Sequence, residues 1–189
     1  SRDELQALDA EASVRAKAVV SSMVKPQMTE FEKALVLHEY ITDTVTYAKW
    51  NGMTSAYTAL VHQTADCVGF ARGLQRLYAA AGLDSFVVVR KKGHLWVKVK
   101  IRGTYYNVDP TWSAVKSRWP QHNWFLLSDA QNVDDAKGVD HILDSGEVYE
   151  AAPALFSLSS ADYPNRKLLR SPQKLRIMGT VSLPPGDKA

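Results

Sequence analysis

Apolar residues recur every three to four positions over residues 3–24, which predicts an amphipathic helix. Lys25-Pro26 ends this helix, because a residue that precedes proline disfavours the helical backbone region. Thr29 and Glu32 then form the pattern of a capping box, in which each side chain bonds the other residue's backbone N–H. The pattern predicts a second helix from there to about Thr46, and a short helical turn over 57–61.

Another helix is predicted to begin at Cys67 and to end before Gly82, a residue suited to the position after a helix. Asp66 is placed to cap its first turn. Gly69 and Gly73 lie inside this helix, where each costs about 1 kcal/mol relative to alanine. We therefore expect that a neighbouring element or a substrate approaches the helix closely at these positions, and that the two glycines give room for this approach over the thiol.

The pattern changes to that of strands after Gly82. Residues 86–89 form a short apolar run, and residues 95–101 alternate between apolar and other side chains, which predicts a half-buried strand with Leu95 on the core face. Arg102-Gly103 predicts a turn, and residues 104–108 predict the returning strand. Helices followed by antiparallel strands indicate an α+β fold, with the Cys67 helix packed on the sheet.

The register of this hairpin decides which polar residues can meet. A two-residue loop pairs Ile101 with Thr104, and it places His94 and Asp109 on the same face as diagonal neighbours. A loop with an odd number of residues would put them on opposite faces. Pro110 keeps Asp109 extended and ends the strand.

We expect three segments: an N-terminal helix (1–24), a core (25–150) and a basic C-terminal segment containing serine and proline (151–189). Four aromatic residues after the hairpin are expected in the core or in a cleft wall: Trp112, Trp119, Trp124 and Phe125. Residues 174–178 could add one more strand.

Composition narrows the classes of function. The net charge of +3 does not indicate nucleic-acid binding, although residues 165–189 hold six basic side chains and one acidic side chain. No apolar run is long enough to cross a membrane. The chain starts at Ser1 and not at methionine, so we expect that a targeting segment was removed, and the localisation stays open.

Cys67 is the only cysteine, which excludes an intramolecular disulfide and a site with several cysteine ligands. The sequence has no G-x-G-x-x-G, P-loop or G-x-S-x-G motif, so no cofactor or metal is expected. Four histidines lack metal-ligand spacing and are interpreted as surface or structural residues, with His141 also a candidate for the cleft: His38, His62, His122 and His141.

The position of Cys67 is that of a possible nucleophile, because a helix N-terminus stabilises a thiolate. The alternative is a small buried apolar residue, the commoner fate of an unpaired cysteine. Thiol catalysis also needs an imidazole and a group that orients it. His94 and Asp109 supply both if they pair, whereas an unpaired His94 would be an ordinary solvated side chain.

At these residues the sequence resembles the transglutaminase-like superfamily, a papain-like group with a Cys-His-Asp triad, and in particular its bacterial secreted and surface members. The resemblance covers roughly residues 25–145. Three segments carry it: Asp66-Cys67-Val68-Gly69-Phe70-Ala71, Gly93-His94-Leu95-Trp96-Val97 and Tyr105-Tyr106-Asn107-Val108-Asp109-Pro110-Thr111-Trp112. Residues 32–47, 55–60 and 124–128 are also similar. Two segments depart from the family: Tyr47-Ala48 stands where members commonly have Tyr-Asp, and Leu95 and Val97 stand where they commonly have Ala and Asn.

The resemblance implies a transglutaminase-core fold and cysteine-dependent acyl transfer on a glutamine or peptide amide, with Cys67, His94 and Asp109 as catalytic residues. It leaves transferase, deamidase and peptidase outcomes open. The implied substrate is a protein or peptide, possibly associated with the cell wall, and the implied location is outside the cell or at its surface. The alternative is a non-catalytic binding or scaffold module of the same fold. Candidates for the cleft or the oxyanion site are the backbone N–H of Cys67 and five side chains: Asn51, Tyr57, Gln63, Trp96 and Trp112.

Overall fold

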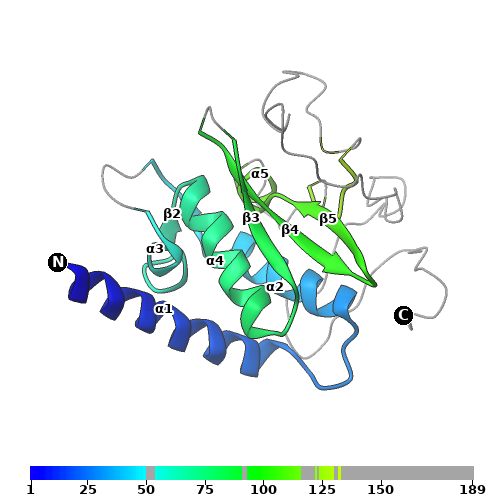
Figure 1. The fold of residues 1–189 in the computed structure, drawn as a ribbon, viewed down its shortest axis with the longest axis horizontal. Helices are drawn as coiled ribbons and strands as arrows, with labels where there is room; N and C mark the ends of the chain where they lie inside the picture. Colours follow the sequence, from blue (N-terminus) through cyan, green and yellow to red (C-terminus); the bar gives the residue numbers. More distant parts are fainter. Residues whose placement is uncertain (50–53, 91–92, 116–121, 123, 130–131, 133–189) are drawn as a thin grey trace.

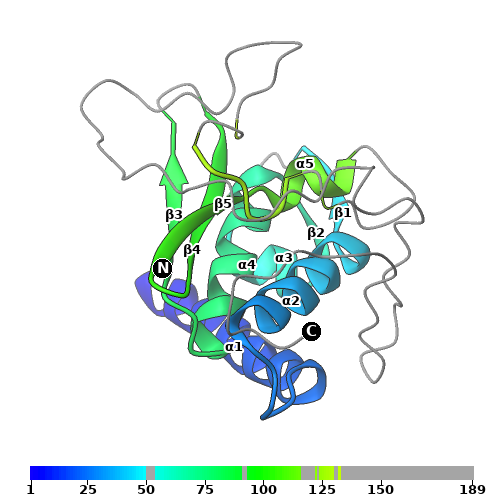
Figure 2. The same cartoon turned by 90° about the vertical axis from the view of Figure 1, so that its right-hand side faces the viewer.

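The computed structural model describes residues 1–49, 54–90, 93–115, 122, 124–129 and 132. Within them it forms an α+β fold in which helices surround one face of an antiparallel sheet (Figures 1 and 2), as predicted. The elements are α1 (Arg2–Met23), α2 (Glu30–Thr44), β1 (Thr46–Tyr47), α3 (Ala56–Leu60), β2 (Thr64–Ala65), α4 (Cys67–Ala80), β3 (Ser85–Val89), β4 (Leu95–Ile101), β5 (Thr104–Val108) and α5 (Pro110–Val115).

The first two helices begin where the sequence predicts. In α2, Thr29 and Glu32 form the reciprocal capping box, which satisfies two backbone N–H groups that have no partner within the helix. In α1, only part of the predicted apolar face is covered: Ala16 is fully buried, but Leu5 and Leu8 are 47% and 37% exposed. The first two turns of α1 therefore extend past the core.

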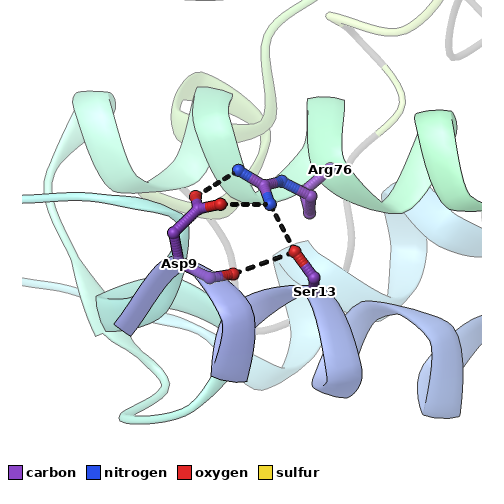
Figure 3. Close-up of polar contacts among 3 residues, drawn as sticks. All are labelled: Asp9, Ser13 and Arg76. Carbon is purple, nitrogen blue, oxygen red and sulfur yellow. Dashed lines mark hydrogen bonds and ion pairs between the residues drawn. The ribbon is translucent and has the colours of Figure 1, made fainter. Parts of the chain in front are cut away.

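Helix α4, which begins at Cys67, is central, and it packs against α1, α2, α3 and β4 (Figure 2). A guanidinium joins it to α1 (Figure 3): Arg76 Nη2 lies 2.5 Å from Asp9 Oδ1, and Arg76 Nη1 lies 3.1 Å from Asp9 Oδ2 and 2.5 Å from Ser13 Oγ. Because Ala16 and Val19 of α1 are buried in the same core, α1 is part of one packed unit with α4.

The two glycines of α4 face other protein elements. A Cβ atom at Gly69 would lie 2.5 Å from Ala65 Cβ, and one at Gly73 would lie 2.9 Å from Ala59 Cβ. These distances are shorter than carbon atoms tolerate. The glycines therefore allow α3 and the chain before Asp66 to approach α4, which confirms the expected close approach of a neighbouring element; the atoms that an added Cβ would meet belong to these elements, so the idea of room for a substrate over the thiol is wrong.

The sheet has the strand order β3-β4-β5 and the predicted register, with Ile101 opposite Thr104. Arg102 and Gly103 turn the chain with φ angles of 51° and 83°, a left-handed pair typical of a two-residue hairpin loop. The backbone N–H of Arg102 donates to Glu30 Oε2 at 2.7 Å, which ties the turn to α2. A separate short pair joins β1 and β2 in parallel.

The outer face of β4 is buried, whereas the sequence predicts a strand with only one buried face. Trp96 and Lys98, which alternate with the core residues, are both fully buried. The reason is a segment later in the chain: Leu127 and Asn107 exchange backbone hydrogen bonds of 2.8 and 2.9 Å along the free edge of β5. This pairing brings Asp129 onto the outer face, where its carboxylate bonds Lys98.

Several predictions lie outside the described residues: Asn51, Trp119, His141, the strand at 174–178 and the segment 151–189. Within the described residues, no helix combines the length and the apolar character that a membrane crossing needs.

Candidate active site

Cys67 is the first residue of α4 and is partly exposed. Asp66 caps the helix, as predicted, because its Oδ1 accepts the backbone N–H groups of Val68 at 3.0 Å and Gly69 at 3.3 Å. The carboxylate of Asp66 is thus engaged with the backbone. The Cys67 thiol Sγ lies 3.7 Å from the carbonyl oxygen of Gly93, the residue before His94.

His94 and Asp109 form the pair that the hairpin register predicts. His94 Nε2 lies 2.6 Å from Asp109 Oδ2, and the two side chains are 14% and 0% exposed. The other carboxylate oxygen, Asp109 Oδ1, accepts the backbone N–H of Trp112 at 3.0 Å in the first turn of α5. The backbone N–H of Asp109 donates to the carbonyl of Trp124 at 2.8 Å. The side chain and the backbone of Asp109 are therefore both fixed by hydrogen bonds.

The charge state of His94 is set by opposing effects. Burial alone lowers the pKa of the imidazole, but side-chain hydrogen bonds to Asp109 and Cys67, and the charges of both, raise its pKa to about 10. His94 is therefore an imidazolium at neutral pH. Because Asp109 occupies Nε2, Nδ1 is the ring nitrogen available for the hydrogen bond with the thiol.

Aromatic rings surround this imidazole. The Trp96 ring stacks against His94, with the ring centroids 6.1 Å apart and an interplanar angle of 23°. Trp112 meets His94 edge-on, also at 6.1 Å, and packs against Trp124 at 5.0 Å. Trp112 is partly exposed, but Trp96 is fully buried. The two predicted tryptophans therefore both reach the site, and of the two Trp112 has the exposure that suits a cleft wall.

The other two described candidates make contacts outside this cluster. The Tyr57 ring packs edge-on against His62 at 4.9 Å. Gln63 is exposed, with a φ angle of 55°, and its carbonyl oxygen accepts the backbone N–H of Thr46 at 2.9 Å. Among the described contacts, the structure joins Cys67, His94 and Asp109 to one another but does not join Tyr57 or Gln63 to them.

Tyr47 is a residue near the site that the sequence reasoning did not single out. Its pKa is raised, first by burial and then by the negative charges of Cys67 and Asp66. The phenol is 39% exposed, and the pairing of β1 with β2 holds Tyr47 opposite Ala65, two residues before Cys67. The signals in the sequence were its place at the end of the segment 32–47 that resembles the family and its match to the tyrosine of the family's Tyr-Asp pair.

Two of the remaining histidines lie in the interior. His122 Nε2 is 2.9 Å from Glu39 Oε1, and the His38 ring packs on Phe125 at 5.0 Å. Both imidazoles are buried. Their contacts fit the interpretation as structural histidines.

Residues 17–110 match the family model of the transglutaminase-like superfamily. The match includes Cys67, His94 and Asp109 and begins within α1. Comparison with the curated proteins finds no match.

Three solved structures are similar at low identity. A structure described as a TGase has 22% sequence identity and a TM-score of 0.46, and the match covers 59% of this chain and 33% of that one. A candidate cysteine protease from Cytophaga hutchinsonii has 18% identity and a TM-score of 0.45, with 53% of this chain and 37% of that one covered. The periplasmic domain of TgpA from Pseudomonas aeruginosa bound to ethylmercury has 19% identity and a TM-score of 0.40, with 58% and 48% covered. The chain thus spans between a third and a half of the lengths of these structures.

Proposed function

We propose that the protein catalyses acyl transfer from an amide through a thioester on Cys67, on the basis of the match between residues 17–110 and the transglutaminase-like superfamily model. The observation that supports this proposal most directly is the position of His94, which bonds Asp109 through Nε2 and also hydrogen-bonds the side chain of Cys67. An imidazole held between a thiol and a buried carboxylate is the arrangement that thiol catalysis requires.

In the first step, the Cys67 thiolate attacks the carbonyl carbon of the amide, and the carbonyl oxygen takes the negative charge. The backbone N–H of Cys67, at the first position of α4, is our proposed donor to this oxygen. The His94 imidazolium then gives its proton to the leaving nitrogen, the carbon–nitrogen bond breaks, and ammonia or an amine departs. A thioester on Cys67 and a neutral His94 remain.

In the second step, water or a primary amine attacks the thioester. His94 accepts a proton from this nucleophile as the carbon–sulfur bond breaks, and the imidazolium–thiolate pair forms again. The product is a carboxylic acid with water and a new amide with an amine. Asp109 holds the ring orientation throughout and does not itself take the proton.

We propose that the substrate is a protein or peptide amide, met outside the cell or at its surface. Trp112 forms the proposed cleft wall next to His94, since it is partly exposed there. Tyr47 is a proposed additional hydrogen-bond donor, because a phenol is protonated at neutral pH and burial beside negative charges raises the pKa of this one further. Tyr57 and Gln63 remain proposals for the more distant part of the cleft.

The competing function is a scaffold that keeps the fold without catalysis, and thiol labelling separates the two. Because Cys67 is the only cysteine, its alkylation by iodoacetamide can be followed on the whole protein by mass spectrometry. We expect His94→Ala to slow labelling near neutral pH by about tenfold or more, since the imidazolium no longer stabilises the thiolate. His62→Ala, at an exposed histidine, is the matched control and should label like the unchanged protein. Equal rates in all three proteins, at the rate of a free thiol, would support the scaffold.

A substrate panel then tests the reaction itself. Glutamine-containing peptides are incubated with and without a primary amine, and ammonia release and product masses are measured. Amine incorporation identifies a transferase, conversion of glutamine to glutamate a deamidase, and chain cleavage a peptidase. The Cys67→Ala variant should give none of these products, and a panel in which it matches the unchanged protein contradicts acyl transfer on these amides.

A further inference from the structure

Four polar side chains form a connected row on the outer face of the hairpin, behind His94: Trp96 and Lys98 of β4, Asn107 of β5, and Asp129. The first three are 0%, 0% and 1% exposed. Burial of a polar group costs free energy unless the group is hydrogen-bonded. The hydrogen bonds within this row offset that cost and hold its side chains in fixed positions.

Asn107 is the junction of this row. Its Oδ1 accepts the indole N–H of Trp96 at 2.9 Å, and its Nδ2 donates to Asp129 Oδ1 at 2.6 Å and to the Leu127 carbonyl at 3.2 Å. The side-chain amide thus uses its oxygen and both of its N–H directions. This pattern allows a single orientation of the amide, because a flipped amide would present an N–H to the indole N–H.

A buried charge pair fixes the far end of the row. Lys98 Nζ lies 2.7 Å from Asp129 Oδ1, the same oxygen that accepts from Asn107. A fully buried ammonium needs a partner that stays in place. Lys98 therefore holds Asp129 against the sheet, and Asp129 in turn holds Asn107.

The near end of the row reaches the imidazole. The Trp96 indole stacks on the His94 ring, and its N–H bond to Asn107 fixes the plane of the indole. The segment that carries Asp129 also bonds the Asp109 backbone through the Trp124 carbonyl. Residues 124–129 are thus connected to both members of the His94–Asp109 pair: to His94 through Asn107 and Trp96, and to Asp109 directly.

We propose that Asn107 is a positioning residue for His94: it orients the Trp96 indole, which sets the plane of the imidazole between Cys67 and Asp109, while Lys98 and Asp129 hold Asn107. This inference rests on the proposed function of the three site residues. It extends the functional unit to residues 124–129, beyond the end of the family match at residue 110.

Two substitutions test the proposal. Trp96→Phe keeps a ring beside His94 but removes the bond to Asn107, and Asn107→Ala removes the junction. For each variant, kcat and KM on the active amide are measured, and the His94 imidazole is titrated by NMR. We expect kcat to fall on the order of tenfold to a hundredfold with KM within about twofold, because a misplaced ring impairs proton transfer more than binding. We also expect the His94 titration midpoint to move below its value of about 10 in the unchanged protein.

Tyr78→Phe is the matched control. It also removes one hydrogen bond of a buried aromatic side chain, from Tyr78 Oη to the Ala34 carbonyl at 3.1 Å, at a distance along α4 from Cys67. It should lower the melting temperature without changing kcat or the His94 titration. If Asn107→Ala does not fold, Trp96→Phe alone decides the question.

The outcomes separate this inference from the proposed function. Unchanged kcat and an unchanged His94 titration in a folded Trp96→Phe variant would overturn the positioning role and leave the acyl transfer standing. If the unchanged protein converts no amide, the proposed function fails, and the NMR titration still decides the positioning role because it needs no substrate.

Discussion

At the scale of single residues, His94 shows how neighbours reverse the effect of burial. A buried imidazole alone would favour its neutral form, but Asp109 and Cys67 both stabilise the charged form. The result is a ring that carries a proton at neutral pH and faces the thiol. Such a ring can serve first as the acid for the leaving group and then as the base for the incoming nucleophile.

The pH dependence of acylation follows from this charge state. We expect the acylation rate to fall above a pH of about 10, by about tenfold per pH unit, as His94 loses the proton that the leaving nitrogen needs. A rate profile of ammonia or amine release across alkaline pH measures it. A profile that already falls near pH 6.5, the value of an ordinary histidine, would contradict the charged pair.

The same titration affects stability with a defined sign. Because the folded pKa of His94 lies above its unfolded value of 6.5, its contribution to stability is fully present below about pH 6.5 and is lost as the pH rises through about 10. Urea unfolding of the unchanged protein and of His94→Gln should therefore differ most near pH 6. The difference should shrink towards pH 10.

At the scale of elements, α4 depends on close contact with its neighbours. Gly69 faces Ala65 and the Thr58 hydroxyl, whose distances to an added Cβ would be 2.5 and 3.0 Å. Gly73 faces Ala59 and Ile41. The two glycines lower the intrinsic stability of the helix, but they let α2, α3 and the chain before Cys67 pack directly against its backbone.

We expect Gly69→Ala to destabilise the protein even though alanine is the better helix former by about 1 kcal/mol. Overpacking of a filled interior costs about 1–3 kcal/mol, and here the nearest atom belongs to a short side chain fixed to the backbone. Thermal or urea unfolding measures the change. Arg72→Ala, at an exposed position of the same helix, is the control and should change stability by about 0.5 kcal/mol or less. A gain in stability for Gly69→Ala would show that the neighbours can move apart.

At the scale of the whole molecule, α1 is held to α4 by burial and by the Arg76 guanidinium (Figure 3). The two terminal nitrogens of the Arg76 guanidinium donate to the two carboxylate oxygens of Asp9, and the Ser13 hydroxyl accepts from one of these nitrogens. This hydrogen bonding is the main reason that the pKa of Asp9 lies below its usual value. The contact joins residues near the start of the chain to the middle of α4.

We expect Arg76→Lys to lower stability by about 0.5 to 1 kcal/mol at neutral pH, because an ammonium cannot bond both oxygens and the pair is largely exposed. The effect should disappear as the pH falls below about 3.8, since the lowered pKa of Asp9 contributes only while the carboxylate is charged. Urea unfolding and amide hydrogen exchange in α1 measure it. Arg72→Lys on the exposed side of α4 serves as the control, and equal exchange in both variants would mean that burial alone holds α1.

The sequence by itself determined the features that depend on neighbours in the chain. The caps at Thr29 and Asp66 are local hydrogen bonds, and they are confirmed. The hairpin register is also confirmed, because a two-residue turn and strict alternation leave one pairing. That register placed His94 and Asp109 on one face as diagonal neighbours, and in the structure His94 Nε2 lies 2.6 Å from Asp109 Oδ2.

Only the tertiary structure decided what surrounds these residues. Alternation along β4 predicted a half-buried strand, but Lys98 bonds Asp129, which lies in a segment after the hairpin. A pattern within one strand carries no information about a segment that packs on it later. Tyr47 is held opposite Ala65, two residues before Cys67, by a short parallel pairing that the sequence analysis did not predict. The chain thus specifies the backbone positions of His94 and Asp109 locally, whereas the burial of the outer face of β4 and the approach of Cys67 to the hairpin depend on segments that meet only on folding.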